Sequence, residues 1–448
     1  MKKDLRGIPL IGADAFALGR YERALDQFQG YVGDPVATID EALQASPGFI
    51  AGHLMKALVL FTLSERKFVP LAAQALEAAR ALAAQANDRE QGLIAATGQL
   101  LEGRWHAASR SIDHVLVNHP RDVLALQVGH LMDFYCGDAL NLRNRISRVL
   151  PHWGTSLPGY SYVLGMHAFG LEEMNQYPEA EATALGALTM QPKDGWAVHA
   201  AVHVMEMQGR IEDGINFLVT READWAPDNG FAFHNFWHLA LFYLDGAHHD
   251  RALSLFDRHV HPEPASFLLP LVDATALLWR LRLEGVDVGD RFERVADDWQ
   301  ARLDGEAGFY AFNDAHAAIA LAATGRESAL AQLTLRMQDA ARQGDTNAAM
   351  TRDVGLPLTE AVAAFVHGRY ADAAARLESI RDGAHRFGGS HAQRDLITLT
   401  LIESALRSGA ASLARHYTAE RLAHKPASQW GARLWARAQS VAPLSSAA

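Results

Sequence analysis

Short turns recur along this chain at a nearly constant spacing, and each turn separates two stretches in which apolar residues have helical spacing. The central residues of these turns are Ser64, Gly103, Gly137, Asn175, Gly209, Gly246, Gly285, Gly325, Gly368 and Gly409, spaced 34 to 43 residues apart. Small residues are favoured where one helix ends and the next begins, because a tight turn there requires a positive φ. The sequence therefore predicts a series of helical hairpins.

The spacing of these turns is that of a known repeat. Asn175 and Gly209 are 34 residues apart, which is the length of a tetratricopeptide unit. Alternating β-branched segments of the kind that form sheets are absent from the sequence. We predict an all-α fold, a right-handed α-α superhelix (tetratricopeptide-like solenoid) of about ten to eleven helical hairpins.

The predicted solenoid occupies the whole chain as a single domain. Residues 1–40 should form an irregular or capping hairpin with a turn near Gly19, residues 41–425 the repeats, and residues 426–448 a C-terminal capping helix and tail. The capping helix is expected over 428–441. Terminal units differ from internal ones because each hairpin can bury its apolar face only against its neighbours.

Composition limits the partners. Lys and Arg number 41 against 52 Asp and Glu, so the formal charge is −11, and basic runs that would neutralise phosphates are absent. We therefore expect no nucleic-acid partner. The basic start is followed by an apolar stretch too short and too interrupted for a signal peptide, and Cys136 is the single cysteine. These features predict a cytoplasmic protein without a membrane partner.

Five segments of the chain resemble one family. They are residues 169–173, 196–207, 234–238, 313–316 and 388–395, and together they resemble the tetratricopeptide repeat protein 38 family in the same order, from roughly residue 40 to residue 420. The resemblance implies an α-solenoid. It implies no activity, substrate or catalytic residue.

Two neighbouring first helices carry a concentration of histidines. In such repeats the first helices of consecutive hairpins line the concave surface. His199, His203 and Glu206 stand at positions i, i+4 and i+7 before the turn at Gly209, so they form one stripe. The next first helix carries His234, Asn235 and His238. We predict that these side chains face a polar groove.

Further polar residues fall on later first helices and on one glycine-rich loop. Neighbouring helices lie about 8 to 10 Å apart, so their side chains can meet over one small ligand. The candidate catalytic residues are His199, His203, Glu206, His238, Asp314 and His316. The candidate ligand-binding residues are His234, Asn235, Asp273, Asn313, His391, Gln393, Arg394 and Asp395.

These residues permit more than one interpretation. His199 and His203 could hold a divalent metal, although the zincin pattern requires a glutamate directly after the first histidine, where Ala200 stands. Alternatively, the histidines are hydrogen-bonded spacers between repeats that donate to Asp and Glu across the groove. The loop 388–395 could bind an anion with its amides, or could be a helix cap with an ion pair between Arg394 and Asp395.

The sequence therefore predicts ligand binding without identifying the ligand. The sequence indicates a helical-repeat protein that binds a small polar or anionic ligand in a histidine-rich groove, with acid/base or metal-assisted chemistry left open. The alternative is a cytoplasmic scaffold that binds a peptide or protein partner. Phosphate-binding, dinucleotide-binding and serine-hydrolase motifs are absent from the sequence, so whether the protein is an enzyme stays open, as does a homo-oligomer.

Overall fold

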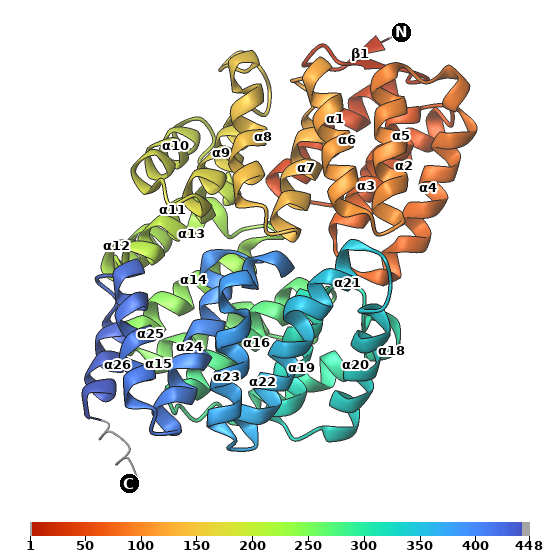
Figure 1. Ribbon diagram of the computed structural model, residues 1–448. Coiled ribbons are helices and arrows are strands. Elements are labelled where there is room, and N and C mark those ends of the chain that lie inside the picture. The colour runs from red at the N-terminus through yellow and green to blue at the C-terminus, as the bar shows by residue number, and fades with distance from the viewer. Residues whose placement is uncertain (1, 441–448) are drawn as a thin grey trace. The chain divides into compact units, whose positions relative to one another are not determined.

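The computed structural model describes residues 2–440, and within them the predicted fold class is confirmed. Helices follow one another in antiparallel pairs, with eleven such pairs from α1–α2 to α24–α25 in the described residues (Figure 1). The chain divides into two compact units, Met1–Ala201 with Glu222–Ala232 and Val202–Arg221 with Phe233–Ala448. The division falls within α11 (Gly195–Gln208).

The first unit contains five hairpins, a small β-ribbon and short 3-10 turns. Its elements are β1 Lys2–Lys3, β2 Pro9–Leu10, α1 Ala15–Gly30, α2 Pro35–Ala45, α3 Ile50–Thr62, η1 Arg66–Phe68, α4 Val69–Ala81, η2 Ala83–Gln85, α5 Asp88–Leu101, α6 Trp105–Asn118, α7 Val123–Tyr135, α8 Ala139–Val149, η3 Leu150–His152, α9 Tyr160–Glu173, α10 Tyr177–Met190 and α13 Glu222–Trp225.

The second unit contains five hairpins after α12, two π-helical segments and a last single helix. Its elements are α12 Ile211–Thr220, α14 Ala232–Asp245, α15 His249–Leu255, η4 Phe256–Val260, α16 Leu268–Leu283, α17 Arg291–Gln300, α18 Leu303–Glu306, α19 Ala311–Ala323, α20 Glu327–Ala340, α21 Thr346–Met350, η5 Thr351–Gly355, α22 Leu356–Val366, α23 Tyr370–Ile380, η6 Arg381–Phe387, α24 His391–Arg407, α25 Ala411–His424 and α26 Gln429–Ser440.

The turn residues have the backbone conformation that the sequence predicts. The central residue has a positive φ, between 55° and 80°, in nine of the ten predicted turns, including Ser64 and Asn175. In the tenth turn the positive φ, 58°, falls on Ala247 instead of Gly246. The turn between α14 and α15 has three residues, Gly246 to His248, as does the turn between α22 and α23, and its middle residue is Ala247.

The N-terminal region differs from the expected turn position and adds a short β-ribbon. Gly19 lies inside α1, and the turn of this first hairpin follows Gly30, where Tyr31 takes a φ of 56°. The chain also contains a strand pair, since β1 and β2 form an antiparallel ribbon in which Lys2 faces Leu10. A ribbon of two residues per strand is too short to give an alternating sequence pattern.

The C-terminal region matches the predicted capping helix. α26 begins at Gln429 and ends at Ser440, and it buries Trp430 and Leu434. The expected helix end at residue 441 and the tail to residue 448 lie outside the described residues.

First helices in both units are buried on almost every side, whereas second helices bury mainly one face. In α16, for example, Leu271 to Leu281 are all buried, while the following α17 buries only Phe292, Val295, Ala296 and Trp299. A polar residue on a first helix is therefore inside the protein. The sequence predicted that such residues face a polar groove and left open how closed it is; their burial requires them to find polar partners.

Candidate functional site

The inner helices of the second unit bring four predicted site residues together in its interior. His203 and Glu206 come from the end of α11, and His234 and His238 from α14. On each helix the pair is separated by about one turn, so both side chains lie on one face. His203 and His238 are completely buried, and His234 and Glu206 are buried to more than nine-tenths.

Two of these histidines are oriented by buried carboxylates. The Nδ1 of His238 donates to Glu206 Oε2 at 2.8 Å, and the Nδ1 of His234 donates to Asp273 Oδ2 at 2.6 Å. Asp273 lies on α16 and is 2% exposed. A carboxylate that accepts from Nδ1 fixes the tautomer and makes Nε2 the more basic nitrogen for another partner.

The three imidazole rings form a compact cluster. The ring centroids of His203 and His238 are 4.5 Å apart, and those of His234 and His238 are 4.8 Å apart. One ligand nitrogen from each of the three residues lies within 4.8 Å of the others. We refer to His203, His234 and His238 as the histidine centre.

The surroundings of His238 disfavour a charged imidazole. Burial lowers the pKa of His238 well below its ordinary value, and the neighbouring His203 and His234 lower it further, as do the positive charges of Lys425 and Arg280. At neutral pH the ring of His238 is therefore uncharged. Neutral imidazole is the form that binds a metal ion.

A series of charged side chains connects the histidine centre to α24 and the end of α25. Lys425, directly after α25, donates from Nζ to Glu206 Oε1 at 3.1 Å and lies 3.5 Å from Asp395 Oδ2. Arg421 holds both oxygens of Asp395, at 3.0 and 2.8 Å. Burial by itself raises the pKa of Asp395, but the charges of Arg421 and Lys425 outweigh it and hold that pKa well below the usual value.

Arg280 adds a further buried cation on the same side of α16 as Asp273. Its guanidinium lies over the ring of Trp237, 5.5 Å from the centroid, and donates to the carbonyl of Ala392 at 2.7 Å. Burial lowers the pKa of Arg280 to about 10. Trp237 in turn stacks on His234, so this cation and the histidine centre share one aromatic neighbour.

His199 precedes His203 by one turn of α11 and belongs to the first unit. There it is surrounded by aromatic rings, with centroid distances of 5.0 Å to Phe169, 4.9 Å to Trp196 and 5.2 Å to Phe231. It is 2% exposed. Asn235, beside His234 on α14, is completely buried.

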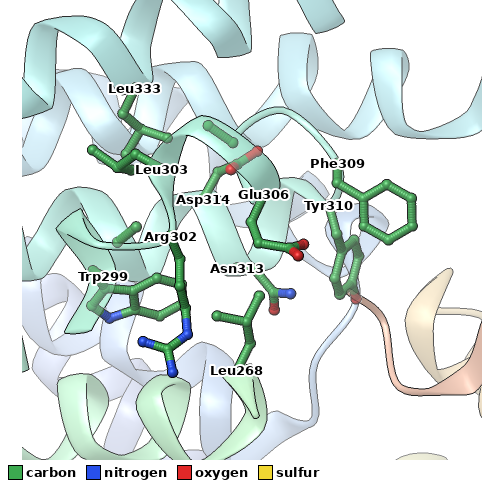
Figure 2. A pocket seen from close by; sticks show the side chains of 12 residues that line it. Leu268, Trp299, Arg302, Leu303, Glu306, Phe309, Tyr310, Asn313, Asp314 and Leu333 are labelled. Carbon is green, nitrogen blue, oxygen red and sulfur yellow. The ribbon is translucent and has the colours of Figure 1, made fainter. Parts of the chain in front are cut away.

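The predicted residues of α19 have other surroundings. The carboxylate of Asp314 accepts from the backbone N–H of Gly308 at 3.1 and 3.2 Å, and Asn313 lines the same small pocket. Figure 2 shows both side chains among Leu268, Trp299 and Arg302. The lining is mostly apolar.

His316, the third predicted residue of α19, is buried as well. Its Nδ1 donates to the carbonyl of Phe312 at 2.8 Å. Burial lowers its pKa to about 4, with a small contribution from Arg280. The ring is therefore neutral in the folded protein at neutral pH.

The residues of the loop 388–395 have two roles: some cap α24, and Asp395 forms an ion pair. Ser390 caps α24 and forms a capping box with Gln393, in which Ser390 Oγ accepts from Gln393 N at 3.2 Å and Gln393 Oε1 accepts from Ser390 N at 3.0 Å. Arg394 bonds the carbonyl of Gly389 and lies 3.3 Å from the Nδ1 of His391. Asp395 pairs with Arg421 instead of the Arg394 considered from the sequence, and so joins the charges behind the histidine centre.

Sequence reasoning missed three residues of this arrangement. Arg280 follows Asp273 by seven residues, a spacing that places both on one face of α16, so a search along that helix would have found it. Lys425 and Arg421 have no helical spacing to any predicted site residue that would have marked them in the sequence. Lys425 contacts Glu206 across 219 positions of the chain, and only the fold brings them together.

Comparisons with known proteins add little beyond the architecture. No family model matches the chain. Similar solved structures include a human IFIT1 dimer with m7Gppp-AAAA, at 13% identity and a TM-score of 0.43, with 96% of this chain and 95% of that chain covered. Another is the APC/C hetero-tetramer Cut9-Hcn1, at 12% identity and a TM-score of 0.45, with 94% and 76% covered.

A membrane-crossing role has no support among the helices of residues 2–440, because none is both long enough and apolar enough to span a bilayer. The helical hairpins and their turn spacing identify the chain as an all-α protein of tetratricopeptide-like repeats.

Proposed function

We propose that this protein binds a divalent transition-metal ion, zinc being the first candidate, through the imidazoles of His203, His234 and His238. The observation that carries the proposal is the histidine centre itself: three ligand nitrogens within 4.8 Å, with two of the rings oriented from Nδ1 by buried carboxylates. With Nδ1 directed to the carboxylate, Nε2 of His234 and of His238 is the nitrogen that would bind the metal.

The geometry requires only a modest contraction of the histidine centre. Zinc binds histidine nitrogens at about 2.0 to 2.1 Å, so tetrahedral ligands are about 3.4 Å from one another. Side-chain rotation supplies the difference from the observed spacing. Asp273 and Glu206 would keep the rings aligned during this movement, and carboxylate partners of this kind strengthen the metal–imidazole bond.

The charges around the histidine centre favour binding of a metal cation, which would then bind an anionic ligand. Three buried cations, Arg280, Arg421 and Lys425, accompany three carboxylates, Glu206, Asp273 and Asp395. Imidazole binds a metal ion in its neutral form, so a bound divalent ion would keep its own charge. A retained positive charge favours an anionic further ligand, such as hydroxide or a small carboxylate. The polar or anionic ligand expected from the sequence would bind in this way.

The spacer interpretation competes with this proposal. Histidines that serve only as hydrogen-bonded spacers would also accept carboxylate partners. The clustering of three rings argues against it, because spacers need partners on neighbouring helices but have no need to approach one another. Membership of the tetratricopeptide repeat protein 38 family and a cytoplasmic location stay proposals that rest on the sequence alone.

Metal uptake tests the proposal. Protein stripped with a chelator and dialysed against zinc should retain one ion per chain, measured by elemental analysis, and cobalt should give the absorption of a tetrahedral nitrogen site. His238→Gln removes the imidazole while its amide can still donate to Glu206, and it should weaken binding by at least about 100-fold. Asp273→Asn should weaken binding about 10- to 100-fold. The exposed His248 provides the matched control, since His248→Gln should change nothing.

Two results would contradict the metal proposal. One is wild-type protein that retains no zinc or cobalt, and the other is His203→Gln and His238→Gln binding as tightly as wild type. Thermal melts of each variant ensure that a loss of metal is not a loss of fold.

A further inference from the structure

The histidine centre is enclosed, so a metal ion can reach it only when part of the protein moves. His203 and His238 have no exposed surface, and His234 is 7% exposed. In the second unit, the segment 425–433, which we call the strap, places the ammonium of Lys425 against the carboxylate that orients His238. The strap comprises the link from α25 to α26 and the first five residues of α26, the two helices that end the second unit (Figure 1), and it contacts the end of α14 through Asp245.

Polar contacts hold the strap, most of them to the ends of α14 and α16. Both oxygens of Asp245, at the end of α14, accept from it: Oδ2 from Ser428 Oγ and Oδ1 from Trp430 N, each at 2.8 Å. Arg433 donates to the carbonyl of Asp245 at 2.8 Å and to Glu284 Oε2 at 2.8 Å. These contacts lie on helix ends, away from the histidine rings.

The strap also meets the turn of the hairpin that carries His203. Gly209, with a φ of 71°, ends α11, and a Cβ placed there would lie 2.7 Å from the backbone of Ala427 and Ser428. The close approach shows that the strap is seated against the end of α11 by backbone contact, in addition to side-chain bonds. It contributes few large apolar side chains, since only Trp430 in it is a buried hydrophobic residue.

We infer that the strap is a gate for the metal: it opens to admit or release the ion and closes through Asp245 and Arg433. The inference rests on the proposed metal site and names its regulation. Opening removes Lys425 from Glu206, which leaves Glu206 and Asp273 as carboxylates that attract an incoming cation. Closing returns the ammonium and excludes water from the site. Segments with few buried apolar contacts are those that open locally while the remainder stays folded.

Metal-transfer kinetics on the full-length protein test this gate. Zinc-loaded protein is mixed with excess EDTA, and the rate of zinc loss is followed at several EDTA concentrations. Asp245→Ala and Arg433→Ala should each lose zinc about tenfold faster, the size expected from losing a charged hydrogen bond. Zinc uptake should accelerate to a similar degree, so the equilibrium Kd should stay within about threefold of wild type. Arg342→Ala, which breaks an exposed ion pair with Asp339, is the matched control.

The outcomes separate the two proposals. Wild type that takes up no zinc overturns the metal site and the gate with it. Zinc binding with loss rates that are unchanged in both strap variants overturns the gate alone. Faster loss together with an equally weakened Kd also overturns it, because that pattern reports damage to the ligands instead of easier opening. Hydrogen exchange over 425–433 should be faster in Arg433→Ala, and equal exchange would contradict a loosened strap.

Discussion

Buried carboxylates have different hydrogen-bond partners in the two units. In the first unit, Asp133 accepts from Arg145 at 2.7 and 2.8 Å and from Ser109 at 2.8 Å, so both of its oxygens are bound. In the second unit, Asp273 and Glu206 accept from imidazoles. The guanidinium of Arg145 is shared among Asp133, Asp113 and Ser109, whereas each imidazole meets its carboxylate through Nδ1 and has Nε2 as a second possible ligand atom. The comparison separates buried charges that hold helices together from buried charges that prepare a site.

The largest effect should come from breaking an arginine pair of the first unit. Asp133→Ala leaves the guanidinium of Arg145, which is completely buried, with only Asp113 as a charged partner. Removing one partner of a buried pair costs about 3 to 5 kcal/mol. Urea denaturation should show this loss in the free energy of unfolding, with zinc binding to the second unit unchanged.

The same variant can break the comparison. A loss below about 1 kcal/mol would mean that the Asp133–Arg145 pair does not stabilise the first unit. A change in zinc affinity would mean that carboxylates in the two units do not have separate roles. Arg148→Ala, which removes a half-exposed arginine that also contacts Asp113, is the control for surface charge.

A smaller, pH-dependent effect should come from Asp194, which caps α11. Its Oδ1 accepts from the backbone N–H groups of Trp196 and Ala197 at 3.1 and 3.0 Å, and the residue is completely buried. Burial raises the pKa of Asp194 to about 7, against the opposing effect of these two hydrogen bonds. In the unfolded chain the pKa is about 3.9.

The sign of this effect follows from proton binding. Between pH 4 and pH 7 the folded state holds the proton and the unfolded state has lost it, so stability falls as the pH rises through this window. Asp194→Asn carries no charge and escapes the fall, which should amount to about 4 kcal/mol. The free energy of unfolding, measured from pH 4 to pH 8, should fall for wild type relative to the variant as the pH rises to about 7. A constant difference would contradict a raised pKa. The exposed cap variant Asp34→Asn gives the background.

The fold was accessible from sequence because its turns depend on local chemistry. A left-handed residue is needed at each hairpin turn, and nine of the ten predicted residues take that conformation. The position of Ala247 was not accessible, because the neighbouring Gly246 is the residue type that usually takes a positive φ, while the middle of the turn is an alanine. The β-ribbon at Lys2 and Pro9 pairs only two residues per strand and left no pattern to detect.

The candidate site was accessible only where it follows helical spacing. His203 with Glu206 and His234 with His238 repeat by about one turn, so each pair was recognisable on its own helix. The burial of these pairs could not be predicted, because polar residues that face an exposed groove and polar residues in a packed interior have the same helical spacing. The pairing of Glu206 with Lys425 depends on how the last hairpin returns to α11, which no local pattern records.

The smallest expected effect compares two capping boxes, one in each unit. Asn87 and Glu90 form one at the start of α5, and Ser390 and Gln393 form the other at the start of α24. Replacing an N-cap residue with alanine costs about 1 kcal/mol, so Asn87→Ala and Ser390→Ala should lower the free energy of unfolding by similar amounts. Neither should alter zinc affinity. If Ser390→Ala weakened zinc or anion binding tenfold while Asn87→Ala did not, the loop 388–395 would be part of the site, and its cap would serve ligand binding as well as the helix.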